Sequence, residues 1–217
     1  MGELDGKVAI VTGAGRLRGI GRAAAVALAR LGADVVVTGT GRSPDSFPED
    51  EKSIGWRDIH SVADQVREIG TRALPMVVDV TDRQAVQTMV DKTLEELGRV
   101  DILINNAAFA RGVDRVPISD LDEDIFQKVM DIKVTGTFLC TKASIKPMID
   151  QGEGGKIVNI SSTAGKRGSA NTLAYNGANF AIVGMTQSMA RELGPHSINV
   201  NAVCPGAVDT HLSLIHI

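Results

Sequence analysis

Short apolar runs alternate with amphipathic segments along the chain, and this alternation limits its possible folds more than any other feature. The first run, KVAIVTG at 7–13, leads through a glycine-rich turn into an Ala- and Leu-rich segment, IGRAAAVALARLG at 20–32. Because the runs are apolar along their whole length, a sheet built from them needs cover on both faces. Right-handed crossovers between parallel strands supply that cover. We therefore predict a single doubly wound, Rossmann-like α/β domain with a parallel sheet of six strands.

The bounds of the predicted elements follow the apolar pattern and its glycine breaks. The predicted strands are 7–13, 33–39, 73–80, 100–108, 154–162 and 197–206, of which 100–108 runs into a loop. The predicted helices are 20–32, 58–70, 82–98, 122–150 and 172–194. One long loop, 39–57, follows the second strand.

Composition excludes several classes of function. The net charge is −3 and the basic residues are scattered, so we expect neither nucleic acid nor an acidic membrane surface as a partner. No apolar run is long enough to span a bilayer, and the polar start MGELDG is unlike a signal peptide, so we expect a cytoplasmic protein. The histidines do not cluster with other ligands, which argues against a metal site. Cys140 and Cys204 are expected to be free thiols.

The turn TGAGRLRGIGRA at 12–23 lies between the first strand and the first helix. Glycines there allow a pyrophosphate to approach the backbone, and the unpaired N–H groups of the helix start favour an anion. Such a turn can also merely connect a strand to a helix. Inside the first β-α unit of a parallel sheet, we interpret it as a dinucleotide-binding turn.

With the turn, further strings make the chain similar to the short-chain dehydrogenase/reductase family over residues 6 to 210. They are DVTD at 79–82, NNAA at 105–108, ISS at 160–162, the helix that carries Tyr175, and PGAVDT at 205–210. The resemblance implies hydride transfer between a nicotinamide cofactor and a small-molecule carbonyl or secondary alcohol. Five residues, 14–18, stand where the family usually has three, and we expect the extra two to bulge outward.

The resemblance also implies a set of cofactor-binding residues. Asp79 and Val80 match the adenine contacts, Asn105 matches a position beside the ribose, and Val208 and Thr210 match contacts to the nicotinamide amide. In the turn, the matching residues are Gly13, Arg18, Gly19, Ile20 and Gly21.

The choice between NADP and NAD depends on charge near the end of the second strand. An acid there holds the free ribose diol of NAD, whereas arginine suits the 2′-phosphate of NADP. This chain has Gly39 at that place, with Arg42 after it and Arg16 and Arg18 in the turn. These arginines could also simply face solvent. We predict NADP as the cofactor in preference to NAD.

Tyr175 is the only tyrosine of the chain, and it matches the proton-transferring phenol of the family. Ser162, thirteen residues upstream, matches the serine that holds the substrate oxygen. Ser161 should point to the other face of its strand because side chains alternate. The other interpretation of Tyr175 is an aromatic residue of an amphipathic helix with no catalytic role.

Two residue types of the family's proton relay are exchanged in this chain. The family has a lysine one turn after the tyrosine, where it lowers the pKa of the phenol and binds the ribose; here that position is Asn179. The family has asparagine where this chain has Lys133. We hypothesise that Lys133 lends its ammonium to the same pocket from the facing helix. The alternative is that Lys133 reaches solvent and the relay is broken.

Two other functions remain open. The chain could bind cofactor without catalysis, as a structural or regulatory subunit. A sugar-nucleotide epimerase is more remote, and the short C-terminal region disfavours it. The tail 211–217 has no family pattern, and we interpret it as sequence from a truncated reading frame, which leaves the family's seventh strand missing. We expect a homo-oligomer formed through 122–150 and 172–194.

Overall fold

The computed structural model describes residues 2–109 and 112–210, and the tail 211–217 lies outside the described residues. Six parallel strands form one sheet in the order β3-β2-β1-β4-β5-β6. The strands are β1 (Val8–Val11), β2 (Asp34–Gly39), β3 (Ala73–Val77), β4 (Ile102–Asn105), β5 (Gly155–Ile160) and β6 (Ile198–Val203). This order confirms the predicted doubly wound architecture, with its topological switch between β1 and β4.

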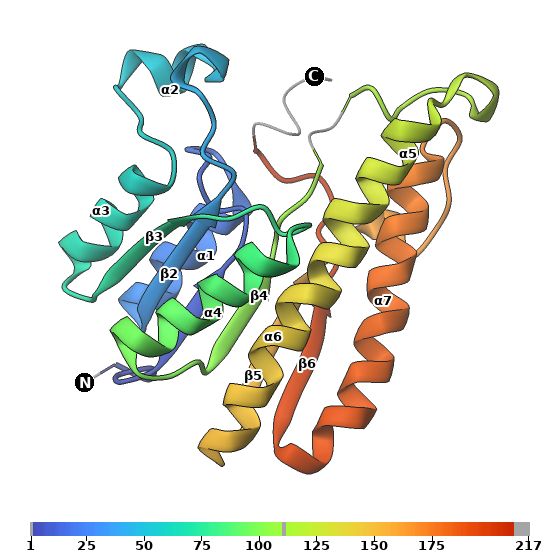
Figure 1. Cartoon of the computed structure of the whole chain (residues 1–217). Coiled ribbons are helices and arrows are strands. Elements are labelled where there is room, and N and C mark those ends of the chain that lie inside the picture. The colour runs from blue at the N-terminus through green and yellow to red at the C-terminus, as the bar shows by residue number, and fades with distance from the viewer. Residues whose placement is uncertain (1, 110–111, 211–217) are drawn as a thin grey trace.

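Helices cover both faces of the sheet (Figure 1). They are α1 (Ile20–Arg30), α2 (Glu49–Ser53), α3 (Ile59–Ile69), α4 (Arg83–Leu97), α5 (Glu123–Met130), α6 (Gly136–Gln151) and α7 (Leu173–Leu193). A π-helical turn, η3 (Asp131–Thr135), joins α5 to α6. Short 3-10 turns lie at η1 (Pro44–Ser46), η2 (Ile118–Asp120), η4 (Thr163–Gly165) and η5 (Gly194–His196).

Alternate strand residues enter two separate cores. Ile10 and Val36 pack with α4 and α6 on one face, while Val11 and Val35 pack with α1 and α3 on the other. All four side chains are fully buried, which explains why the strands are apolar throughout. Burial of each such aliphatic side chain contributes about 1.5–3 kcal/mol to the stability of the sheet.

Local signals in the sequence set the ends of several helices. Asp82 begins α4 by accepting hydrogen bonds from the N–H groups of Gln84 and Ala85, at 2.8 and 3.2 Å. Gly98 ends the same helix in the left-handed conformation, with φ of 85°. Helices bounded in this way fix the direction in which the chain enters the following strand.

Two segments differ from the elements that the sequence predicts. The helix predicted over 122–150 is interrupted by the wide turn η3, and the long loop 39–57 contains η1 and α2. Phe47 and Trp56 of that loop are buried against the core between the sheet, α1 and α3. The loop is therefore an ordered part of the domain.

Candidate active site

The loops that follow the strands meet at one edge of the sheet, because parallel strands share a direction. At the centre of this edge, the glycine-rich turn packs tightly against the end of β4. A Cβ atom on Gly13 would lie 2.8 Å from the Cα atom of Ala107, and one on Gly21 would lie 2.5 Å from Nδ2 of Asn106. Gly13 also has a left-handed φ of 64°. Glycine is therefore required at both positions by the packing of the turn itself.

Thr12 and Asn106 hold the turn to β4, and the sequence reasoning did not identify either residue. The hydroxyl of Thr12 accepts hydrogen bonds from the N–H groups of Asn106 and Ala107, at 3.0 and 3.1 Å. Nδ2 of Asn106 donates to the carbonyls of Thr12 and Gly13, each at 2.9 Å. The string NNAA contains Asn106, but the family resemblance points to the first asparagine, Asn105, and not to the second.

The start of α1 fits a bound pyrophosphate. Gly19 is its N-cap and provides no side-chain hydrogen bond, and the first turn carries no acidic residue. Neither a capping side chain nor an acidic residue of the first turn therefore competes for the N–H groups of that turn. These groups, including those near Ile20 and Gly21, can bind an anion.

The two extra residues of the turn are anchored by the segment that follows β2. The N–H of Leu17 donates to Oε1 of Glu51 at 2.9 Å, and Nε1 of Trp56 donates to the carbonyl of Gly15 at 2.7 Å. Gly15 and Leu17 of the turn therefore contact α2 and the residues after it, whereas an outward bulge of two extra residues remains a prediction. Sequence reasoning missed both contacts, although Trp56 is the chain's only tryptophan.

Arg42 lies in a largely buried ion-pair cluster behind the turn. Its guanidinium bonds Oε2 of Glu51 at 2.8 Å and Oδ1 of Asp58 at 2.9 Å, and it stacks 4.6 Å from the ring centroid of Phe47. Burial opposes the charge, but the hydrogen bonds that Arg42 donates to both carboxylates raise its pKa. Arg42, which the sequence predicts to bind a 2′-phosphate, thus pairs with two carboxylates in this structure. Its role in cofactor binding remains a prediction.

Arg16 lies beside this cluster, half-buried. Burial, and then the charge of Arg42, lower its pKa. The carboxylate of Asp58 occupies the space beside the turn: a Cβ atom on Gly15 would lie 1.8 Å from its Oδ1. Gly39, at the end of β2, is also near, since a Cβ atom there would lie 3.8 Å from Oδ2 of Asp58. The carboxylate of Asp58, at the start of α3, therefore lies close to the end of β2.

The segment after β6 folds back toward the turn. Oδ1 of Asp209 forms an ion pair with Nη2 of Arg18 at 2.5 Å, and the carbonyl of Pro205 accepts from the N–H of Thr163 at 2.9 Å. The neighbours of Asp209 differ in exposure: Thr210 is buried and Val208 is exposed. These contacts bring the PGAVDT segment to the same edge as the turn and the end of β5.

The residues predicted to surround the adenosine lie at the ends of β3 and β4. Asp79 accepts hydrogen bonds from the N–H and hydroxyl of Thr81, beside a hollow of about 220 Å³ near the start of α5. Val80 is buried against Gly136, where a Cβ atom would lie 2.6 Å from its Cγ2. Asn105 is buried, and its Nδ2 donates to Oδ1 of Asn159 at 2.9 Å. The side chain of Asn105 therefore links β4 to β5.

Ser162 and Tyr175 lie on either side of the loop that joins β5 to α7. Ser162 lies two residues after the end of β5 and caps η4, where its Oγ accepts from the N–H of Ala164 at 3.2 Å. Tyr175 lies in the first turn of α7, which packs against η4. Asn176 fixes the loop because its Nδ2 donates to the carbonyls of Ala164 and Arg167, at 2.7 and 2.8 Å. Sequence reasoning missed Asn176, whose contacts depend on the folded loop.

Asn179 and Lys133 both turn inward from facing helical segments. Nδ2 of Asn179 donates to the carbonyl of Tyr175 at 2.8 Å, and the backbone carbonyl of Asn179 accepts from Oγ of Ser161 at 3.0 Å. Nζ of Lys133 donates to the carbonyl of Ile160 at 2.5 Å. Lys133 is only 6% exposed, so it does not extend to solvent, and burial lowers its pKa to about 8.

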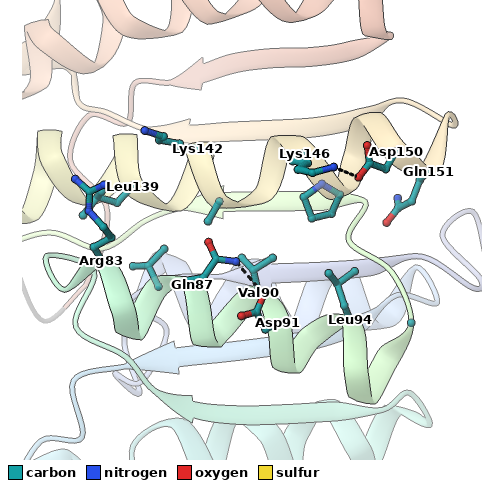
Figure 2. A pocket seen from close by; sticks show the side chains of 14 residues that line it. Arg83, Gln87, Val90, Asp91, Leu94, Leu139, Lys142, Lys146, Asp150 and Gln151 are labelled. Carbon is teal, nitrogen blue, oxygen red and sulfur yellow. Dashed lines mark hydrogen bonds and ion pairs between the residues drawn. The ribbon is translucent and has the colours of Figure 1, made fainter.

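A larger groove, of about 620 Å³, lies between α4 and α6 (Figure 2). Its floor is apolar, with Val90, Leu94 and Leu139, and its rim is charged, with an ion pair between Lys146 and Asp150 at 2.5 Å. Among the residues that the structure describes, none of the predicted site residues lines it. The groove is therefore separate from the candidate active site.

Two further searches concern metals and membranes. Over residues 2–109 and 112–210, no group of three or more His, Cys, Asp or Glu residues is placed to hold a metal ion. In the same part of the chain, no helix combines the length and apolar character that crossing a membrane requires. Cys140 and Cys204 are both free, as predicted.

Known proteins are similar to this chain in sequence and in fold. The family model described as short chain dehydrogenase matches residues 7–214. A short chain dehydrogenase/reductase of Aspergillus oryzae, astE, is 42% identical over 212 residues, which cover 98% of this chain and 75% of the relative. A galactitol 2-dehydrogenase of Agrobacterium fabrum is 38% identical over 207 residues, 95% of this chain and 72% of the relative.

The crystal structure of carveol dehydrogenase from Mycobacterium avium in complex with NAD has the same fold. It superposes with a TM-score of 0.86 at 34% identity, covering 98% of this chain and 74% of that chain. The family match thus extends over the glycine-rich turn, the six-stranded sheet and the Ser162–Tyr175 loop. On these grounds the chain belongs to the short-chain dehydrogenase/reductase family of NAD(P)-dependent oxidoreductases.

Proposed function

We propose that the protein transfers a hydride between NADP(H) and a small-molecule carbonyl or secondary alcohol. The observation that carries this proposal is the meeting of the glycine-rich turn, Ser162 and Tyr175 at one edge of the sheet. Galactitol 2-dehydrogenase, a relative by sequence, is named for oxidation at a carbon that bears a secondary hydroxyl.

Each residue of the site has a distinct role in this proposal. The bound nicotinamide would supply or accept the hydride. Ser162 would hold the substrate oxygen through its hydroxyl, and Tyr175 would exchange the proton of that oxygen. The N–H groups after Gly19 would bind the pyrophosphate. Asp79 and Val80 would border the adenine, Asn105 the ribose, and Val208 and Thr210 the nicotinamide amide.

Lys133 would complete the proton relay in place of the lysine that Asn179 replaces. Its burial supports this role, because an amine with a pKa of about 8 gives and takes protons near neutral pH. Its ammonium donates to the carbonyl of Ile160, two residues before Ser162. Asn179 would bind the ribose and hold the backbone of Tyr175.

The preference for NADP(H) rests on the arginines around the turn. Arg16 has no hydrogen bond or ion pair to a carboxylate in the described part of the chain. Burial, followed by the charge of Arg42, lowers its pKa, so a 2′-phosphate would offset that repulsion. NAD(H) is the competing cofactor. Asp58 favours it, because this carboxylate lies beside Gly15 at the place where a ribose diol is usually held.

A cofactor-binding subunit without catalysis is the second candidate function. The absence of a lysine at Asn179 favours it, since loss of acid–base assistance lowers rates by about 10²–10⁴. Separating the two functions requires binding and turnover to be measured on the same preparation.

Trp56 offers a direct binding assay because it contacts the glycine-rich turn through Gly15. We expect NADPH, and more weakly NADH, to change the fluorescence of this single tryptophan. Turnover is then measured over a panel of aliphatic, cyclic and polyol-derived carbonyls. Tyr175→Phe is the matched control, which should bind cofactor but not turn over. Binding without turnover by the parent would establish the second function, and no binding of either cofactor would overturn both.

We also propose that the protein assembles through two long helical segments. Phe138 of α6 and Phe180 of α7 are each 46% exposed, so apolar surface is available for a homo-oligomer through 122–150 and 172–194. Sedimentation of Phe138→Glu and Phe180→Glu variants would test this surface. A cytoplasmic location and a tail at 211–217 without function remain predictions.

A further inference from the structure

A guanidinium group lies over the ring of the chain's only tyrosine. The Cζ atom of Arg115 is 4.2 Å from the ring centroid of Tyr175, well within the distance at which cations and aromatic rings attract each other. Arg115 belongs to the loop between β4 and α5, so it reaches Tyr175 from a segment distant in sequence. Its side chain is 18% exposed, which limits screening of its charge by solvent.

Arg115 supplies a positive charge beside Tyr175, where the lysine of the family is replaced by Asn179. One turn after Tyr175 stands Asn179, which is neutral and donates to a backbone carbonyl. A phenol that loses its proton becomes an anion, and a cation close to the ring favours that anion. Arginine retains its charge at any pH at which a phenol titrates.

We propose that Arg115 is a positioning residue whose stacked guanidinium stabilises the negative charge that develops on the oxygen of Tyr175. Its contribution to turnover rests on the proposed function, but its effect on the phenol does not. The step involved is loss of one proton from the Tyr175 hydroxyl to solvent or to the relay, with no change of oxidation state.

Other charged groups near Tyr175 modify this effect. Asp114 is 2% exposed and its Oδ2 lies 3.6 Å from Nε of Arg115, so it offsets part of the positive charge. Lys133 faces α7 from η3, and its pKa of about 8 means that it is neutral at the higher pH at which a free phenol titrates. Two further cations, Lys166 and Arg167, follow η4 and are exposed.

Because Tyr175 is unique, the ultraviolet absorbance of tyrosinate reports this one side chain in the whole protein. The experiment titrates the protein without cofactor by rapid pH jumps, with Trp56 fluorescence confirming that the chain is still folded. We expect Arg115→Gln to raise the titration midpoint by about one pH unit, and Arg115→Lys to restore part of the difference. Arg83→Gln, an exposed arginine on α4, is the control and should match the parent.

Asp114→Asn gives a test of opposite sign that keeps an acceptor for the N–H of Gly112. Removing this carboxylate should lower the titration midpoint of Tyr175. This variant serves as the test of the proposal if Arg115→Gln does not fold. The proposal is overturned if the titration midpoint of Arg115→Gln stays at the parent's value. If Arg115→Gln does not fold, the proposal is overturned when the midpoint of Asp114→Asn stays at the parent's value. An equal shift in Arg83→Gln also overturns it. Cofactor binding and turnover are measured separately, so a failure of the proposed function leaves this result readable.

Discussion

Replacing Lys133 with methionine tests how this buried amine is held. Burial lowers its pKa from 10.5 to about 8, which corresponds to a cost of roughly 3 kcal/mol for keeping the ammonium charged in the folded protein. Methionine has a similar shape but no charge, and it loses the charge-assisted hydrogen bond to Ile160, worth about 2 kcal/mol. We expect Lys133→Met to be about 1 kcal/mol more stable than the parent at pH 7.

The same burial fixes how stability should change with pH. Below about pH 8, Lys133 is protonated in both the folded and the unfolded chain, so the full cost is present. Between about 8 and 10.5, the unfolded chain binds more protons at this residue, so the contribution of Lys133 to the free energy of unfolding rises with pH. Above that window both states are neutral and the cost is gone. In Lys133→Met this rise should be absent. Cys140 acts in the opposite direction above about pH 9, because burial raises the pKa of its thiol to about 12.

Urea unfolding followed by Trp56 fluorescence measures both effects. The series runs from pH 7 to the upper end of the window, with Lys128→Met, on the exposed surface of α5, as the control. The control should keep the parent's stability and its pH dependence. The reasoning is refuted if Lys133→Met is less stable than the parent at pH 7, or if the stability difference between the two proteins stays constant across the window.

Three further predictions concern the active site and the turn. Tyr175→Phe should lower kcat by about 10²–10⁴ while cofactor affinity changes little, as steady-state kinetics and Trp56 fluorescence would show; equal kcat would remove Tyr175 from the proton transfer. Gly21→Ala should destabilise the protein by about 1–3 kcal/mol and weaken cofactor binding, because the new Cβ would lie 2.5 Å from Nδ2 of Asn106; unchanged urea midpoints would contradict this. The double variant Lys133→Asn, Asn179→Lys should turn over faster than the parent; if it is slower, the exchange of the two residues is itself the functional arrangement.

Much of the fold was predictable because strand burial leaves a continuous apolar signal. The segment VAIV at 8–11 is buried at every position, and alternate residues enter the two cores. The turn was predictable for a related reason, since Gly13 and Gly21 are required by contacts of the backbone itself. Strand ends were placed too far along, because the residues after Asn105 are bound to the turn and leave the ladder.

The partners of the charged residues could not be predicted. Arg42 and Asp58 are sixteen residues apart, and they meet because the loop between them folds back through α2 against the turn. No periodicity encodes such a contact. The same holds for Arg115 and Tyr175, which come together through the packing of the β4–α5 loop on α7. Charge in a sequence therefore indicates what a site could bind, whereas the fold decides which charges are already neutralised.

The π-helical turn η3 makes the number of residues in this segment matter as much as their identity. Successive residues of an α-helix point about 100° apart, so a wide turn that holds one additional residue resets the orientation of all that follows it. Deleting a single residue within Asp131–Thr135 would return the segment to regular α-helix and rotate Lys133 away from Ile160. The inward orientation of the Lys133 side chain therefore depends on the number of residues in this segment. A deletion would change that orientation while leaving the composition of the helix almost unaltered.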